Sequence, residues 1–145
     1  MITDKLLRVS TDQSVALTDT SAVSTDTGDL GVARDMGEGR DLYAVFTATT
    51  AIAGGTSTKF EVIVASDAAL TTVIVVIGST GAVATASIGA QQIVRFNPLV
   101  GSKGQRYLGM RYTVVGTNSA GKVTADVVTD IQDGKKFYAS GFTVA

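Results

Sequence analysis

A glycine-bounded run that ends in lysine is the part of this sequence closest to a known chemical motif. Residues 116–122, Gly-Thr-Asn-Ser-Ala-Gly-Lys, match the G-x-x-x-x-G-K spacing of a phosphate-binding loop. That motif works where the loop leads from a strand into a helix and a Ser or Thr after the lysine holds magnesium. Here Val123 follows the lysine, and the next residues alternate as in a strand. We therefore interpret the run as a polar turn whose glycines allow positive φ.

Carboxylates are the next groups that could carry chemistry. Asp126, Asp130 and Asp133 are close in sequence, but the first two fall on the same polar face of a predicted strand. We interpret them as solvated charges, because an acid–base pair needs a cleft that this pattern does not provide. Asp26 and Asp29 lie in a predicted loop without the spacing of an EF-hand, which leaves only a weak option for a metal ion.

Nucleophilic catalysis has little support in the sequence. Ser102 and Lys103 are neighbours between two glycines of a predicted loop, where adjacent side chains seldom face each other. The chain has no Cys and no His, which excludes thiol chemistry, the usual zinc sites and His-based triads. We predict no catalytic residue, no metal and no cofactor, so the protein is not expected to be an enzyme. A hydrolase on a β-sandwich stays as a third hypothesis, which a deep pocket holding two buried carboxylates would favour.

Composition favours one all-β domain. The chain has 145 residues, of which 45% are hydrophobic and only 17% charged, with 16 Gly and a single Pro. A net charge of −1 argues against nucleic acid as a partner. Residues 1–41 hold eight acids and four bases, whereas the remainder holds five acids and eight bases. This asymmetry is either chance among solvated side chains or a sign of contact between unlike patches of neighbouring subunits or of a partner.

Neither export nor membrane insertion is expected. Met1–Ser10 lacks an apolar stretch and carries Asp4, unlike a signal peptide. The longest strongly apolar run, Val73–Ile77, is far shorter than a membrane span. We therefore expect synthesis in the cytosol and no membrane partner.

The longest strand pattern runs from Arg106 to Gln132. Even positions of its first half are apolar from residue 108 to 114, and odd positions of its second half are mainly apolar from 123 to 131. Because successive strand side chains point to opposite faces, each half has one face toward a core. We predict a hairpin with its turn at Thr117–Ala120, which places Arg111 opposite Asp126 across the two strands.

Shorter patterns bring the predicted total to about eight or nine strands. Val73–Ile77 is apolar on both faces, so we predict a strand that is covered on both sides. Ser66–Leu70 is typical of one helical turn, capped by Ser66 or Asp67. Further strand candidates lie at residues 13–17, 21–24, 41–50, 58–65, 82–87, 91–97 and 135–144.

The strand count predicts an all-β fold, a jelly-roll-like sandwich of two sheets. An immunoglobulin-like sandwich is the alternative, because both folds are built from short, closely spaced strands. Residues 1–12 are expected to form an N-terminal arm, and residues 13–145 a single β-sandwich domain.

Three stretches carry a resemblance to a known family. They are Leu6-Leu7 to Ser14 with Asp12-Gln13-Ser14; Asp29-Leu30-Gly31 through Ala33-Arg34-Asp35 to Gly37, Gly39, Leu42 and Tyr43; and Arg106-Tyr107-Leu108, Arg111-Tyr112-Thr113-Val114 and Gly116 to Ala125. In these stretches the chain resembles the capsid cement, or decoration, proteins of short-tailed bacteriophages, of the Bordetella-phage jelly-roll type.

The resemblance implies a jelly-roll structural protein of the virion. Such a protein is made in the host bacterial cytoplasm and associates with itself, with a dimer favoured. It binds the outer capsid surface and cements neighbouring subunits of the major capsid protein. Cementing needs no chemistry, because weak contacts repeated over many copies add as avidity.

Arms and loops are the expected contact elements, because they carry most function on a rigid scaffold. The residues expected to contact the capsid or a neighbouring subunit are Leu6, Leu7, Arg8, Arg34, Asp35 and Met36. In the competing interpretation, Leu6 and Leu7 pack on the domain's own core, and Arg34 and Asp35 form a local ion pair.

A different phage module is the alternative function. A tail, neck or receptor-binding sandwich with a carbohydrate-binding surface would need exposed aromatic side chains. The tyrosines that could supply them are Tyr43, Tyr107, Tyr112 and Tyr138.

Overall fold

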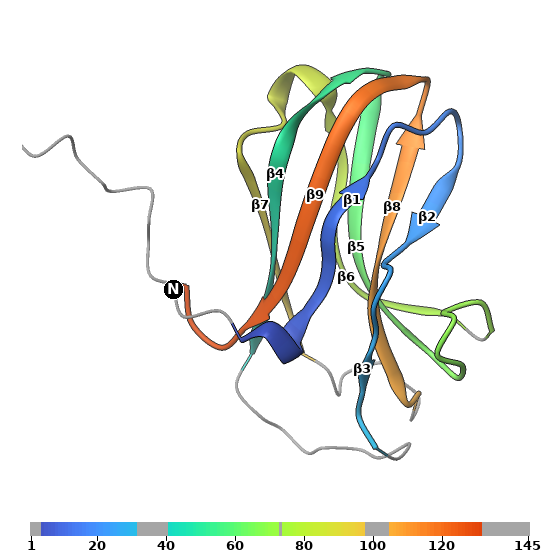
Figure 1. Ribbon diagram of the computed structural model, residues 1–145, viewed down its shortest axis with the longest axis vertical. Helices are drawn as coiled ribbons and strands as arrows, with labels where there is room; N and C mark the ends of the chain where they lie inside the picture. Colours follow the sequence, from blue (N-terminus) through green and yellow to red (C-terminus); the bar gives the residue numbers. More distant parts are fainter. Residues whose placement is uncertain (1–3, 32–40, 73, 98–104, 132–145) are drawn as a thin grey trace, which may run out of the picture.

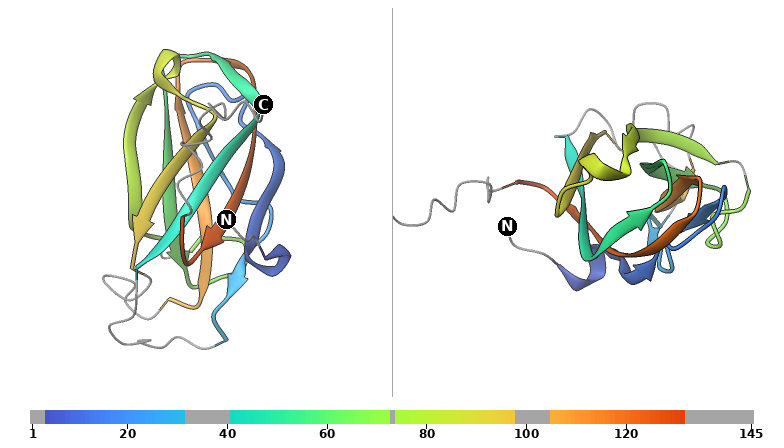
Figure 2. Two further views of the ribbon diagram at one scale, coloured as in Figure 1. Left: turned by 90° about the vertical axis from the view of Figure 1, so that its left-hand side faces the viewer. Right: turned by 90° about the horizontal axis from the view of Figure 1, so that it is seen from above.

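The chain folds into two antiparallel β-sheets packed face to face (Figures 1 and 2). A computed structural model describes residues 4–31, 41–72, 74–97 and 105–131. One sheet has the strand order β1-β9-β4-β7, and the other has the order β2-β8-β5-β6, with β3 also paired to β8. Within the described ranges the only helices are two single 3₁₀ turns, so the predicted all-β class is confirmed.

The elements are short and follow one another closely. The strands are β1 (Arg8–Ser14), β2 (Ser21–Val23), β3 (Gly28–Asp29), β4 (Leu42–Gly54), β5 (Ser57–Ala65), β6 (Val75–Ala84), β7 (Gln91–Phe96), β8 (Tyr107–Val115) and β9 (Asn118–Val128). The 3₁₀ turns are η1 (Lys5–Leu7) and η2 (Thr85–Ser87).

The strand order is that of a jelly roll. Among the described strands, β5 and β6 are the only consecutive pair that are neighbours in a sheet; the chain otherwise passes from one sheet to the other, or, between β2 and β3, returns to the same partner strand. This wrapping of eight main strands into two packed sheets distinguishes a jelly roll from an immunoglobulin-like sandwich. The predicted jelly-roll sandwich is therefore confirmed.

Three aromatic rings join the two sheets at the centre of the core. The ring centroids of Phe46 in β4 and Phe60 in β5 are 5.2 Å apart. The Phe46 ring also stands edge-on to the ring of Tyr112 in β8, with a centroid distance of 5.9 Å. The hydroxyl of Tyr112 donates a hydrogen bond to Ser10 Oγ of β1 at 2.8 Å. This buried hydroxyl therefore has a partner, and burial raises the pKa of Tyr112.

The predicted hairpin between residues 106 and 132 is wrong. Both strands form, but β8 belongs to one sheet and β9 to the other, so their apolar faces meet across the core. Arg111 lies opposite Glu61 of β5, whereas Asp126 lies opposite Arg8 of β1 and Val45 of β4. The predicted cross-strand pair of Arg111 with Asp126 therefore does not form.

The connection between β8 and β9 explains this outcome. Gly116 adopts a left-handed φ of 82°. The carbonyls of Val115 and Thr117 accept hydrogen bonds from Thr56 and Gly55, at the turn between β4 and β5. The two connections thus bond to each other at one end of the sandwich. Because β9 follows immediately and no helix does, the interpretation of residues 116–122 as a turn and not a phosphate loop is confirmed.

The sandwich begins earlier than predicted. Strand β1 starts at Arg8, and Val9 is buried in the main core. Residues 8–12, which we had placed in the N-terminal arm, therefore form part of a sheet. Alternation is weak here because β1 changes register twice along β9.

The strand predicted at Val73–Ile77 is not covered on both sides. Strand β6 begins at Val75 and lies at the edge of its sheet, and Val76 is 42% exposed. Val73 and the strand predicted at residues 135–144 lie outside the described residues. Within the described ranges, no helix has the length and apolar character needed to cross a membrane.

Candidate interaction surface

The turn η1 presents two leucines to solvent. Asp4 begins the turn, and its Oδ1 accepts a hydrogen bond from the Leu6 amide at 2.9 Å. The amide of Arg8 closes the turn on the Lys5 carbonyl. Leu6 is 86% exposed and Leu7 is 42% exposed, so the interpretation that they pack on the domain's own core is wrong for Leu6 and at most partly met by Leu7. Exposed apolar side chains on an ordered turn are candidate contact points.

An ion pair fastens this turn to the sheet. Arg8 Nε donates to Asp126 Oδ1 of β9 at 2.8 Å, and the hydrogen bond raises the pKa of Arg8. The Asp126 side chain is buried, so our interpretation of it as a solvated charge is wrong. Arg8, which was predicted as a contact residue, is thus a half-exposed anchor beside the two leucines.

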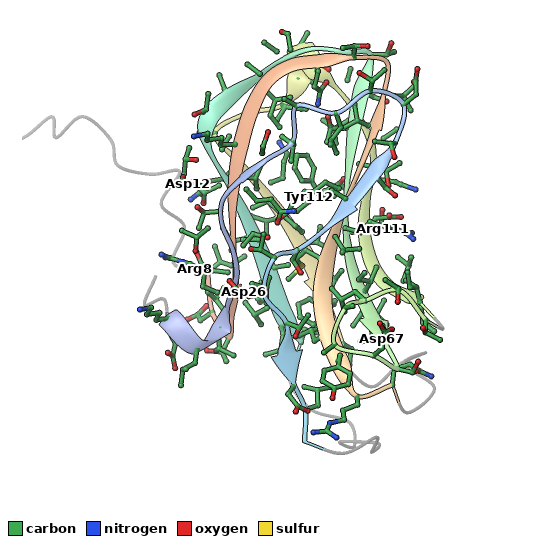
Figure 3. The ribbon with its side chains drawn as sticks, turned by 45° about the vertical axis from the view of Figure 1, so that its right-hand side comes forward. Arg8, Asp12, Asp26, Asp67, Arg111 and Tyr112 are labelled. Carbon is green, nitrogen blue, oxygen red and sulfur yellow. The ribbon has the colours of Figure 1, made fainter. Side chains whose placement is uncertain are left out.

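Two exposed carboxylates lie along the same edge of the sandwich (Figure 3). Asp12 belongs to β1, and its amide donates to Thr124 Oγ1 at 3.1 Å. The amide of Asp26 donates to the Val9 carbonyl at 3.0 Å, which holds the loop after β2 against β1. Asp4, Lys5 and Arg8 lie beside them, so this edge carries charges of both signs, and a partner that binds there would present complementary charges of both signs.

A bidentate ion pair lies at the lower end of the β2-β8-β5-β6 sheet, next to β3. Arg106 donates from Nε and Nη2 to the two carboxylate oxygens of Asp29, each at 2.7 Å. The hydrogen bonds from Arg106, and a further one from the Gly31 amide, lower the pKa of Asp29 from 3.8 to about 2. Because both oxygens of Asp29 are occupied by arginine, the weak metal option at Asp26 and Asp29 loses one of its two proposed ligands.

Two chain connections begin and end at this same end of the sandwich, and the residues at which they leave or enter a strand are called their roots below. The amide of Leu30 donates to the Arg106 carbonyl at 3.0 Å, so the chain leaves β3 beside the point where it enters β8. Leu42 pairs with Phe96, and Asp41 forms an ion pair with Arg95, so the other two roots also adjoin. Arg34, Asp35 and Met36, which were predicted as contact residues, belong to the first connection and lie outside the described residues.

These features gather at one end of the molecule. Figure 1 shows η1 and β3 toward the lower end, and η2 at the opposite end. Leu6, Leu7 and Arg8 therefore lie toward the same end as the roots beside Asp29 and Leu42.

A second charge cluster lies on the outer face of the β2-β8-β5-β6 sheet. Glu61 is buried there, with Oε1 2.9 Å from Lys59 Nζ and Oε2 2.7 Å from Arg111 Nε. Burial alone would raise the pKa of Glu61, but the hydrogen bonds from Arg111 and Lys59 lower it below its ordinary value. The sequence held no signal that Arg111 pairs with Lys59 and Glu61, because the partner strand of β8 could not be predicted from it.

A shallow pocket lies near the opposite end. Its volume is about 270 Å³, and it is lined by Ala48, Ala51, Ile52, Ile88, Gly89 and Ala90. These side chains supply neither a carboxylate nor a nucleophile. The pocket therefore lacks the two buried carboxylates that a hydrolase would require.

Comparison with known proteins identifies a phage family. The sequence model of Bbp16, a family of Bordetella phage proteins, matches residues 9–127. No curated protein matches the chain. The matched range runs from the second residue of β1 to the last but one of β9, and it includes the strands between them in full.

Proposed function

The chain belongs to the Bbp16 family of phage proteins, and from this premise we propose that it is a structural protein of the virion. It binds the outer surface of the capsid and cements neighbouring subunits of the major capsid protein. The jelly-roll fold supports this role, since many viral capsid domains share it.

The exposed leucines of η1 carry the proposal. Leu6 and Leu7 stand on a turn that is capped by Asp4 and anchored through Arg8 to Asp126. Burying one such side chain in an interface contributes about 1.5–3 kcal/mol. A contact of this size is weak in one copy, but it becomes strong when it is repeated around a shell.

Arg34, Asp35 and Met36 extend the proposed contact surface. They belong to the connection whose roots are held by Asp29 with Arg106 and by Asp41 with Arg95.

The proposal assigns no catalysis. The two buried carboxylates of the described residues, Glu61 and Asp126, lie on the outer faces of different sheets, and each is paired with an arginine. They are therefore not available as an acid–base pair.

The described tyrosines give little support to a carbohydrate-binding tail, neck or receptor-binding module. Tyr112 is fully buried, and Tyr43 and Tyr107 are half-buried. Tyr138 lies outside the described residues.

The experiment compares shell binding of two variants. Leu6→Ser with Leu7→Ser removes the apolar contact, while Val115→Ser removes an apolar side chain that is 51% exposed at the far end of β8. We expect the double variant to bind shells of its own phage at least about tenfold more weakly, and Val115→Ser to bind as the unmodified protein does. Equal binding by all three proteins would refute the assignment of η1 as a contact.

A further inference from the structure

A second apolar cluster lies outside the sandwich core, on the outer face of the β2-β8-β5-β6 sheet. Ile63 and Ala65 of β5 are fully buried there together with Leu70. Partly buried side chains surround them, from Val23, Ile74 and Tyr107. An outward sheet face would normally leave such side chains in water. Leu70 comes from the segment Ser66–Thr72, which follows β5 directly and is called the strap below.

The strap is closed on itself by one carboxylate. Asp67 accepts hydrogen bonds from the Thr71 amide at 3.0 Å, the Thr72 amide at 2.6 Å and the Thr71 hydroxyl at 2.7 Å. The amide of Ser66 donates to the Thr72 carbonyl at 3.1 Å, which joins the two ends. Asp67 is thus one of the two caps that the sequence predicted, although the segment forms a turn and not a helix. All of these bonds lie within the strap, so lifting it off the sheet would break none of them.

Leu70 holds the strap to the sheet in a conformation that costs energy. Its φ is 56°, in the left-handed region that β-carbon sterics disfavour by about 1–2 kcal/mol. Burial of the side chain offsets this cost, because Leu70 is almost inaccessible to solvent.

Gly109 of β8 provides the space that Leu70 occupies. A β-carbon at position 109 would lie 2.2 Å from Leu70 Cδ1 and 2.9 Å from Ser24 Oγ. An alanine at position 109 would therefore force the side chain of Leu70 or Ser24 to move from its place under the closed strap.

We propose that the strap is a latch that opens and closes as one unit on a sandwich that stays folded. The side chain of Leu70, called the catch, holds the strap to the sheet, and it packs into the space above Gly109, called the socket. Opening keeps the hydrogen bonds of Asp67 and exposes only Leu70 and the side chains beneath it, so it needs less free energy than global unfolding. The open state uncovers Ile63 and Ala65 as an apolar patch on the outer face.

A single introduced thiol tests the latch, because the chain has no cysteine of its own. Ala65→Cys places a thiol under the strap, and Ala125→Cys places a matched thiol in the main core; both alanines are fully buried. We expect an aromatic disulfide reagent to modify the Ala65→Cys protein on the order of 100-fold faster than the Ala125→Cys protein in native buffer. Equal rates would mean that both sites open by global unfolding alone, which would overturn the proposal.

Gly109→Ala sharpens the same test. Its methyl group would fill the socket of Leu70, so the ratio of the two modification rates should rise further when it is combined with each cysteine variant. An unchanged ratio would contradict the role of Leu70 as the catch.

A second pair of thiols covers the case in which one of these cysteine variants does not fold. Ile63→Cys places its thiol under the strap, and Val62→Cys places one in the main core on the same strand; both side chains are fully buried. The Ile63→Cys protein should be modified faster in native buffer, and equal rates for this pair would overturn the proposal.

Discussion

Each buried carboxylate of the described residues is matched by a basic side chain, and in each case an arginine from another strand takes part. Asp126 of β9 is paired with Arg8 of β1, and Glu61 of β5 is paired with Arg111 of β8 and with Lys59 of its own strand. A buried charge that loses its partner is costly, whereas an exposed pair contributes little. These pairs therefore favour one strand register over its alternatives.

Glu61 offers the clearest test at this scale. Glu61→Gln keeps the shape of the side chain but weakens its bonds to Arg111 and Lys59, so we expect it to lower the free energy of unfolding by about 1–3 kcal/mol. Asp130→Asn, which changes an exposed carboxylate, should alter it by less than about 0.5 kcal/mol. Urea unfolding followed by circular dichroism measures both. A Glu61→Gln protein as stable as the Asp130→Asn protein would show that the cluster is not stabilising.

The lowered pKa of Asp29 predicts how the free energy of unfolding changes with pH. Its pKa is lowered from 3.8 to about 2 in the folded protein, mainly by the hydrogen bond from Arg106. A lowered pKa means that its contribution is complete above pH 3.8 and is lost as the pH falls through 2. The Asp29→Asn protein should therefore lose less stability than the unmodified protein across this window. Parallel melting temperatures from pH 5 to pH 2 would contradict the prediction.

At the scale of the element, periodicity predicted faces but not partners. The strands at residues 41–50, 58–65 and 91–97 were predicted within a few residues, because each is a short apolar stretch bounded by polar or turn residues. The predicted pairing of β8 with β9 was wrong. Two strands whose apolar faces meet across a core show the same alternation in sequence as two strands that lie side by side in one sheet. Strand β9 pairs with β1 and β4, and these partners are distant from it in sequence.

The candidate contact residues show the same limit. The sequence left open whether Leu6 and Leu7 are exposed or pack on the core, and the anchoring of Arg8 to Asp126 needed the register of β1 against β9. The strap was predicted only as a capped turn, because the fit of Leu70 against Gly109 is a contact between distant residues.

Leu70 and Gly109 should behave as one unit in a double-mutant cycle. Gly109→Ala introduces a β-carbon against Leu70 Cδ1, and Leu70→Ala removes that atom. Gly109→Ala should thus cost less in the Leu70→Ala background, with a coupling of about 1–3 kcal/mol, although contact with Ser24 leaves part of the cost. The free energies of unfolding of the four proteins measure it. Strict additivity would contradict the packing described here.

At the scale of the whole molecule, uncharged segments and exposed carboxylates lie in different parts of the sandwich. Residues 42–58 and 68–94 contain no charged side chain, and they supply most of β4, β6 and β7 together with η2. The exposed carboxylates Asp4, Asp12 and Asp26 lie on the opposite edge, along β1. Contacts along β1 should therefore weaken as the salt concentration rises.

Self-association belongs to the proposed role, with a dimer favoured. A net charge of −1 does little to keep copies apart, and the edge strand β6 carries no charged residue. Sedimentation equilibrium of the purified protein should give about twice the chain mass of 14.9 kDa at micromolar concentration. A single species of 14.9 kDa up to the highest soluble concentration would argue against a dimer in solution.

Cosedimentation of the purified protein with capsid shells of its own phage tests the central claim most directly. Mature and immature shells, at several salt concentrations, distinguish a late addition to the virion from an early one. The proposed role predicts saturable binding at a fixed number of copies per capsid subunit, with a preference for mature shells. Absence of binding to either shell by a protein that circular dichroism shows to be folded would contradict the cementing role and favour a tail, neck or receptor-binding module.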